Sequence, residues 1–124
     1  MALPIHTSVN NVFIHVKDLK KAAEWYSTLL GLSFNPNQIE SPVYNIPVPG
    51  KTGLTLDDHS FDPSFTFTRT NAVLFNFYAE DIDEAYNYVL SKNGKIVREI
   101  ERIGSFAYFN FEDLDGNVLM ICNN

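Results

Sequence analysis

The side chains best suited to chemistry in this 124-residue chain are a histidine near its start and an Asp-Asp-His run in its middle. His15 lies in an alternating stretch, and Asp57, Asp58 and His59 follow an apolar one. Imidazole and carboxylate groups are ligands for divalent transition metals. Such a site requires His15 and Asp57 to face one cavity. We interpret His15 as a polar lining residue and the run from Asp57 to His59 as a solvated strand end; a displaced metal site is the alternative.

A duplicated pattern positions these side chains. Residues 12–31 and 75–94 match at an offset of 63 positions, which aligns three pairs of residues: Asp18 with Asp81, Ala22 with Ala85, and Gly31 with Gly94. Each copy combines an alternating strand, an aspartate that caps the following helix, and a short amphipathic helix that a glycine ends. The pattern predicts strands over 9–16 and 72–79, a helix between Asp18 and Gly31, and a second helix over 81–92.

Further strands complete the two copies. Prolines and glycines separate them, and they are expected over 32–39, 42–47, 52–57, 95–102, 105–112 and 117–122. The chain is then one domain, 1–124, with a first module at about 9–57, a connector at 58–71 and a second module at about 72–124. The connector contains Phe61, Phe65 and Phe67, so we expect it to pack on the protein or to cover a cleft.

The composition excludes several classes of function. A net charge of −6 argues against nucleic acid as a partner, because phosphate binding needs a basic surface. No segment approaches the roughly 20 apolar residues of a membrane-spanning helix, and the first residues do not show the pattern of a signal peptide. The single cysteine, Cys122, cannot form an internal disulfide. We expect a cytoplasmic protein with neither a nucleic-acid nor a membrane partner.

Four motifs together resemble one superfamily. They are V-K-D-L-K-K-A-A-E-W-Y from Val16, L-G-L from Leu30, A-E-D-I-D-E-A from Ala79 and F-E-D-L-D-G-N-V-L-M from Phe111. In this order they are similar to the vicinal oxygen chelate superfamily, which contains glyoxalase I, extradiol dioxygenases, fosfomycin-resistance transferases and bleomycin-resistance proteins. The resemblance implies an α+β fold in which tandem βαβββ modules form two curved mixed sheets around a concave pocket. It also implies a homodimer.

The resemblance further implies where a metal would be held. Enzymes of that superfamily usually bind one divalent metal through a histidine or glutamine, a glutamate, a second histidine and a second glutamate, and the metal polarises two neighbouring substrate oxygens. The motifs place these four positions at Asn11, Thr55, Leu74 and Met120, or at Asp57 in place of Thr55 if the strand register differs by two. Leucine cannot bind a metal, and the other three are weak ligands for these ions. We therefore expect no metal and no other cofactor.

Strand alternation predicts which side chains line the pocket. Phe75, Phe77, Phe109 and Phe111 are expected beneath helices, so the residues between them face the other way. Together with the positions named above, they give the predicted ligand-binding residues: Asn11, Phe13, His15, Thr55, Asp57, Leu74, Asn76, Tyr78, Phe106, Tyr108, Asn110 and Met120. Aromatic walls with a few amide and hydroxyl groups are typical of a small-molecule pocket.

These observations favour a metal-free protein that binds a small, partly aromatic ligand, as bleomycin-resistance proteins sequester theirs, with no catalytic residue. The first alternative is a lyase, isomerase or dioxygenase of glyoxalase type, whose rebuilt metal site would use His15, Asp57 or His59. The second is an interaction module whose own side chains fill the pocket.

Overall fold

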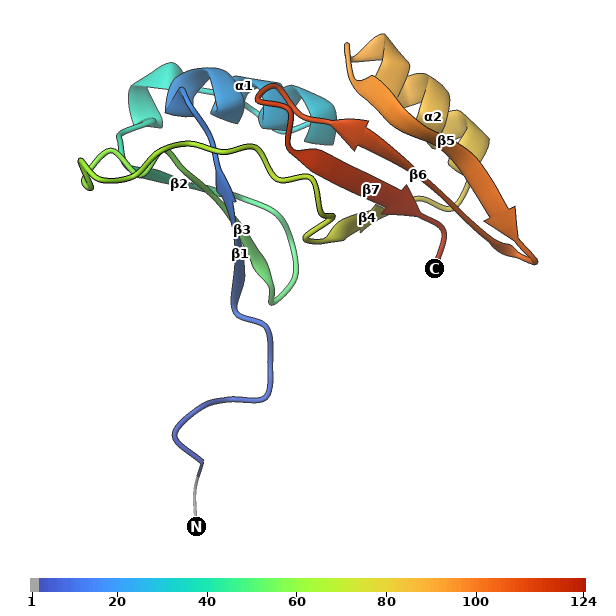
Figure 1. Ribbon diagram of the computed structural model, residues 1–124, viewed down its shortest axis with the longest axis horizontal. Helices are drawn as coiled ribbons and strands as arrows, with labels where there is room; N and C mark the ends of the chain where they lie inside the picture. The colour runs from blue at the N-terminus through green and yellow to red at the C-terminus, as the bar shows by residue number, and fades with distance from the viewer. Residues whose placement is uncertain (1–2) are drawn as a thin grey trace.

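The computed structural model describes residues 3–124 and confirms the predicted α+β fold (Figure 1). Within these residues two mixed sheets are formed. The first has the strand order β1–β3–β2 and consists of β1 (Asn11–His15), β2 (Val43–Ile46) and β3 (Gly53–Asp57). The second has the order β4–β7–β6–β5 and consists of β4 (Asn76–Tyr78), β5 (Lys95–Ile103), β6 (Phe106–Glu112) and β7 (Val118–Cys122).

One helix covers each sheet. Helix α1 (Leu19–Leu30) packs on β2 and β3, and α2 (Ile82–Ser91) packs on β5, β6 and β7. Both predicted caps are present: the Asp18 carboxylate accepts the Lys21 N–H at 3.1 Å, and the Asp81 carboxylate accepts the Glu84 N–H at 3.0 Å. Neither helix, nor any other in residues 3–124, is long and apolar enough to cross a membrane.

The first and last strands of each module pair in parallel. β1 runs beside β3, and β4 runs beside β7. The residue after each first strand donates its N–H to the final residue of the last strand: Val16 to the Asp57 carbonyl at 3.1 Å, and Ala79 to the Cys122 carbonyl at 2.9 Å. The duplicated sequence therefore gives a duplicated backbone frame.

Two predicted strands differ from the structure. Residues 32–39 form no strand; Pro36–Gln38 make a turn of 3-10 helix that the Asn35 side chain caps. A proline cannot donate to a sheet ladder, and an asparagine before it favours the turn. The strand expected over 72–79 is only β4 (Asn76–Tyr78), so Leu74 lies outside the sheet.

The turn between β6 and β7, with the sequence D-L-D-G-N, makes hydrogen bonds to the first module. The Asp113 carboxylate accepts the Tyr26 hydroxyl of α1 at 2.6 Å and the Asn117 side-chain N–H at 3.0 Å. The same Asn117 amide group donates to the His15 carbonyl at the end of β1 at 2.9 Å. Burial, together with the Asp113 carboxylate, raises the pKa of Tyr26 well above its usual value, so the hydroxyl stays a donor. The turn thereby fixes β1 and α1 against the second sheet.

The connector 58–71 packs on the body, as predicted. Phe65 lies against the imidazole rings of His15 and His59, and the Phe67 ring is 5.3 Å from the Lys17 ammonium. Farther along, the Thr70 carbonyl accepts the Val118 N–H at 2.8 Å. The connector therefore links the ends of both sheets.

Candidate functional site

The open face of the first sheet, turned away from α1, carries the polar residues that the sequence predicts. The register pairs Phe13 with Thr55 and His15 with Asp57. Because side chains alternate along a strand, Thr55 and Asp57 share this face. Thr55 is 2% exposed and Asp57 is 5% exposed, whereas Phe13 is 48% exposed.

An amide–hydroxyl chain crosses this face. The Asn11 side-chain N–H donates to Thr55 Oγ1 at 2.7 Å, and the Thr55 hydroxyl donates to Asn45 Oδ1 at 2.6 Å. Asn45 was not among the predicted residues. The Asn11 Oδ1 atom is buried without a hydrogen-bond partner, and it sits where a Cβ on Gly53 would come within 2.6 Å of it. Glycine at position 53 therefore makes room for the Asn11 amide.

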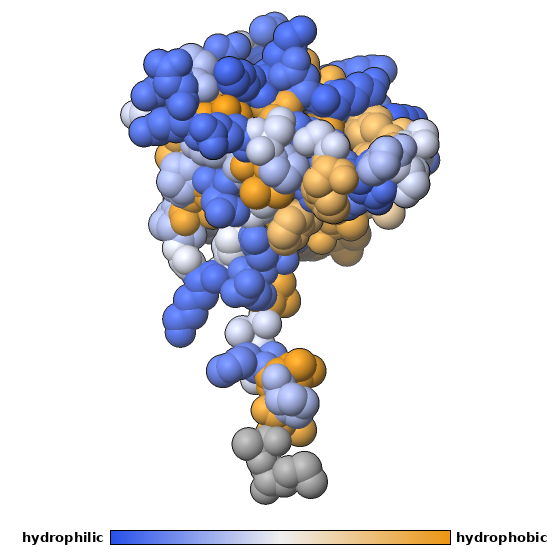
Figure 2. Space-filling model, turned by 90° about the vertical axis from the view of Figure 1, so that its left-hand side faces the viewer, coloured by the Kyte–Doolittle hydropathy of each residue, from blue (hydrophilic) through white to orange (hydrophobic). Residues whose placement is uncertain are grey.

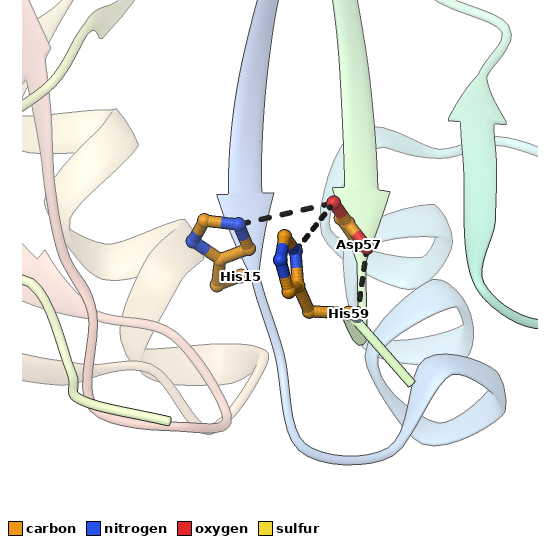
Figure 3. A group of neighbouring side chains, drawn as sticks. All are labelled: His15, Asp57 and His59. Atoms are coloured by element: carbon orange, nitrogen blue, oxygen red, sulfur yellow. Dashed lines mark hydrogen bonds and ion pairs between the residues drawn. The ribbon is translucent and has the colours of Figure 1, made fainter. Parts of the chain in front are cut away.

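At the end of this face three metal-ligand side chains converge (Figure 3). Asp57 Oδ2 is 3.8 Å from His15 Nε2 and 3.4 Å from His59 Nδ1, and one donor atom from each residue lies within 4.8 Å of the others. His59 has a left-handed φ of 54°, and its backbone N–H donates to Asp57 Oδ1 at 2.7 Å.

The interpretation of Asp57 as part of a solvated strand end is thus wrong. The backbone turns back at His59, so its ring covers the carboxylate instead of leaving it in water.

The open face of the second sheet is more aromatic. Asn76 and Asn110 both pair with Met120, and Tyr78 and Tyr108 both pair with Cys122. The Phe106 and Tyr108 rings are 5.7 Å apart, and the Tyr108 hydroxyl donates to Glu101 at 3.2 Å. The Asn110 Oδ1 atom is buried without a partner. Leu74, which was expected on this face, is 55% exposed and outside β4.

The four positions at which the resemblance implies metal ligands do not fit a divalent metal. Leu74 offers no donor, and Met120 offers only a soft thioether. Asn11 and Thr55 are joined to each other through the Thr55 oxygen, and neither supplies negative charge. Tight sites for these ions need imidazole, thiolate or carboxylate ligands.

A cavity of about 570 Å³ lies between the two modules. Most of its wall is apolar and comes from the helix-facing side of β1, β3 and β4 and from the segments beside them: Val12, Leu30, Leu32, Val48, Pro49, Leu54, Phe75 and Phe77. Thr52, Gly53, Asn76 and Tyr78 complete it. Of the twelve predicted ligand-binding residues, this cavity brings together Asn76 and Tyr78. The other ten lie on the open faces or, as Leu74 does, beside them.

Two helix-covered mixed sheets, each with its first and last strands paired in parallel, are consistent with tandem βαβββ modules, although in the part of the chain that the structure describes the first module has three strands and the second has four. Residues 8–121 match the profile of the Glyoxalase/Bleomycin resistance protein/Dioxygenase superfamily. The chain belongs to this superfamily, as its motifs predicted.

Several solved structures have the same fold. A superfamily member from Sphaerobacter thermophilus is 21% identical with a TM-score of 0.74, covering 96% of this chain and 98% of the other. A lactoylglutathione lyase from Agrobacterium tumefaciens is 19% identical with a TM-score of 0.69, covering 96% and 95%. A Nocardioides member of the superfamily is 15% identical with a TM-score of 0.76, covering 98% and 85%. A search of curated proteins finds no match.

Proposed function

We propose that the protein binds a small, partly aromatic molecule in the cavity between its modules and sequesters it without chemistry. The cavity itself carries this proposal. Its volume of about 570 Å³ falls within the range of about 300–1,000 Å³ that small-molecule sites occupy. Its apolar wall with a few polar groups also has the usual make-up of such sites.

The wall indicates the kind of ligand. Phe75 and Phe77, whose rings are 5.2 Å apart and nearly perpendicular, offer surfaces for a flat apolar group. Asn76, Tyr78 and Thr52 are the lining residues with polar side chains, and the Thr52 hydroxyl already donates to the Val9 carbonyl at 2.9 Å. A bicyclic aromatic body with one hydrogen-bonding substituent suits this combination.

The predicted residues on the open faces extend the proposal beyond the cavity. Asn76 and Tyr78 belong to both the cavity and the open face of the second sheet. Asn110 on that face and Asn11 on the first sheet each carry a buried amide oxygen without a partner. A buried polar atom costs free energy when it has no hydrogen bond, and a ligand donor that reached either oxygen would remove that cost.

The experiment is a melting-temperature screen with bicyclic aromatic acids and amines, followed by NMR titration of each compound that stabilises the protein. A ligand of the native state raises the melting temperature by mass action. We expect the amide signals of Leu54, Phe75 and Phe77 to shift most. The variant Val48→Trp, which fills the cavity, should weaken binding at least tenfold.

The matched control is Val97→Trp, because Val97 is 43% exposed on β5 and outside the cavity. It should bind the same compounds as the unmodified protein. Equal affinity in the Val48→Trp variant, or no stabilising compound in the panel, would contradict the proposal and favour an interaction module.

We also propose that the protein is a cytoplasmic homodimer. The segment before β1 projects from the body and exposes apolar side chains (Figure 2): Leu3, Ile5 and Val9 are 70%, 74% and 65% exposed. Apolar surface of this kind is typical of contacts between chains, and the free, buried Cys122 suits a reducing compartment. Light scattering at tens of micromolar tests the assembly, and a monomer mass would reject it.

A further inference from the structure

We propose that His15, Asp57 and His59 bind a divalent transition-metal ion. This site differs from the cavity and from the four positions that the superfamily resemblance implies. It lies at the end of β1 on the open face, whereas Val12 reaches the cavity from the opposite face and about 10 Å farther back along the strand. The inference is therefore independent of the proposed ligand-binding function.

The donor atoms are already near the spacing that a metal requires. Ligands at about 2.0–2.1 Å from a tetrahedral ion lie about 3.3 Å from one another. Asp57 Oδ2 is 3.4 Å from His59 Nδ1 and 3.8 Å from His15 Nε2. The two histidine donor atoms lie within 4.8 Å of each other, so closing the site requires the imidazoles to approach, and His15 is the more exposed of the two.

Neighbouring groups orient Asp57 and His59 in the way that a metal site requires. The backbone N–H of His59 donates to Asp57 Oδ1 at 2.7 Å, so Asp57 Oδ2 remains available to an ion. On the other side of the His59 ring, Nε2 is 3.6 Å from Asp62 Oδ2, so the Nε2 proton can face a carboxylate while Nδ1 presents its lone pair. A carboxylate behind a ligand histidine is the usual second shell of a metal centre.

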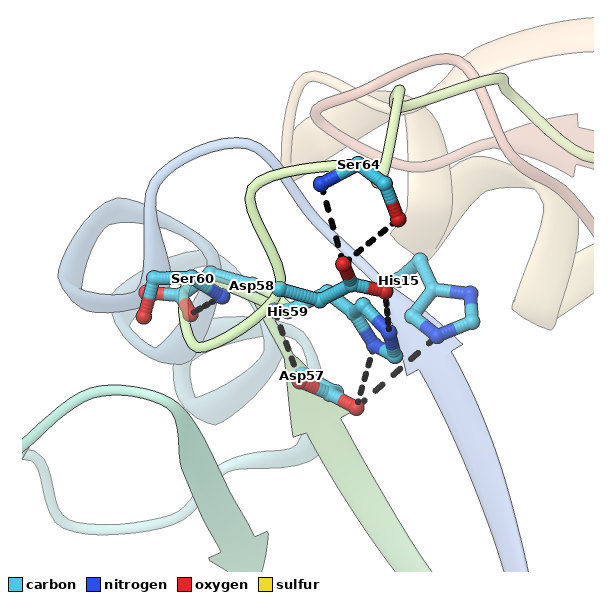
Figure 4. Close-up of polar contacts among 7 residues, drawn as sticks. His15, Asp57, Asp58, His59, Ser60 and Ser64 are labelled. Atoms are coloured by element: carbon cyan, nitrogen blue, oxygen red, sulfur yellow. Dashed lines mark hydrogen bonds and ion pairs between the residues drawn. The ribbon is translucent and has the colours of Figure 1, made fainter.

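The Asp62 carboxylate is itself fixed. It accepts the Ser64 N–H at 2.9 Å and the Ser64 hydroxyl at 2.6 Å; Ser64 lies on the other side of His59 from Asp57 (Figure 4). Aromatic rings of the connector hold the imidazoles: Phe65 is 5.0 Å from His15 and 4.3 Å from His59, and Phe61 is 4.4 Å from His59. These rings restrict the rotation of both ligands.

The ligand set selects the class of ion. Two imidazoles and one carboxylate suit Zn, Ni, Co or Fe(II), whereas Ca and Mg prefer sites made of oxygen atoms. The His15 side chain is 41% exposed, so further coordination positions are open to water or to a ligand atom.

The competing arrangement uses a proton instead of a metal. A protonated His59 donates from Nδ1 to Asp57 and from Nε2 toward Asp62, and the geometry is then an ion pair. The two accounts differ in one measurable respect, because only the metal site binds an ion through all three side chains.

The test is isothermal titration of Co(II), Ni(II) and Zn(II) into tag-free, chelator-treated protein. We expect one ion per chain and a Co(II) visible spectrum of low-coordinate geometry. Asp57→Asn, His15→Gln and His59→Asn should each weaken binding at least tenfold, and Asp62→Asn should do so by about tenfold. Asparagine at position 59 keeps the left-handed backbone.

The matched control is His6→Gln, since His6 is exposed and outside the cluster; its affinity should equal that of the unmodified protein. If Asp57→Asn fails to fold, the His15 and His59 variants carry the test. Absence of binding, or binding that His15→Gln and His59→Asn leave unchanged, would overturn the proposal and leave the ion pair as the explanation.

Discussion

The ends of the two parallel strand pairs share a backbone and differ in side chains. At the end of β1 and β3, His15 pairs with Asp57; at the end of β4 and β7, Tyr78 pairs with Cys122. Both ends are closed by the same type of N–H to carbonyl hydrogen bond. The duplicated frame therefore supports a polar, ion-binding end in one module and an aromatic end in the other.

The segments that follow the two strands explain the difference. After Asp57 the chain turns back at His59 and brings Phe65 onto the histidines. After Cys122 it continues beside β6, where the Asn123 side-chain oxygen accepts the Ala107 N–H at 2.9 Å. Within residues 3–124, three metal-ligand side chains converge at the first end, where the connector brings Phe65 onto both histidines.

The largest effect on the free energy of unfolding is expected from shortening the buried apolar side chains that lie next to the two strand ends. Leu56 in β3 is 0% exposed and Ile121 in β7 is 8% exposed, and each lies on the helix-facing side next to the residues compared. Leu56→Ala and Ile121→Ala should each lower the free energy of unfolding by about 2–5 kcal/mol, measured by urea denaturation. Leu114→Ala, at a half-exposed position, should stay within about 0.5 kcal/mol. A large loss for one strand only would mean that the frames are not equivalent.

A smaller difference is expected between the two tyrosines that connect the modules. Tyr26 of α1 donates to the buried Asp113 carboxylate at 2.6 Å, and Tyr88 of α2 donates to the Leu29 carbonyl at 2.7 Å. Tyr26→Phe should cost about 1–3 kcal/mol because it withdraws a donor from a buried charge, and Tyr88→Phe about 0.5–1 kcal/mol because its site is partly exposed. Thermal unfolding measures both, and equal losses would contradict the ranking.

The smallest effect concerns Asp115, in the turn against the end of β1. Burial, only partly offset by the Lys17 N–H and reinforced by the Asp113 charge, raises the pKa of Asp115. The stability tied to its protonated form is complete below the usual aspartate pKa of about 3.9 and is lost as pH rises through the raised value. Asp115→Asn should therefore stabilise the protein at neutral pH by less than about 1 kcal/mol and have no effect below about pH 3.9. A gain that is independent of pH would contradict this cause.

Much of the fold follows from local patterns in the sequence. Asp18, Gly31 and Asp81 mark the helices, and the strand alternation correctly assigns Phe109 and Phe111 to the buried side. The segment 32–39 was predicted as a strand, but Pro36 lies at its centre and the segment forms a 3-10 turn over Pro36–Gln38. The strand predicted over 72–79 is shortened to Asn76–Tyr78 although it contains no proline, so alternation gives the faces of the strands better than their ends.

The site could be predicted only in part. Alternation placed His15, Thr55 and Asp57 on one face, but the burial of Asp57 depends on a left-handed turn at His59 that no periodic pattern encodes. The packing of Phe65 on both imidazoles likewise joins distant segments. The cavity also escaped prediction, because its wall consists of helix-facing residues such as Val12 and Leu54 at the junction of two modules.

The most direct test of the contrast between the two strand ends is a crystal structure of the protein soaked with Co(II), with anomalous data collected above the cobalt edge. We predict a peak bonded to His15 Nε2, Asp57 Oδ2 and His59 Nδ1, with none beside Tyr78 and Cys122. A peak at Asn11, Thr55 or Met120, or no peak at the His15 cluster in crystals that bind cobalt in solution, would contradict the account.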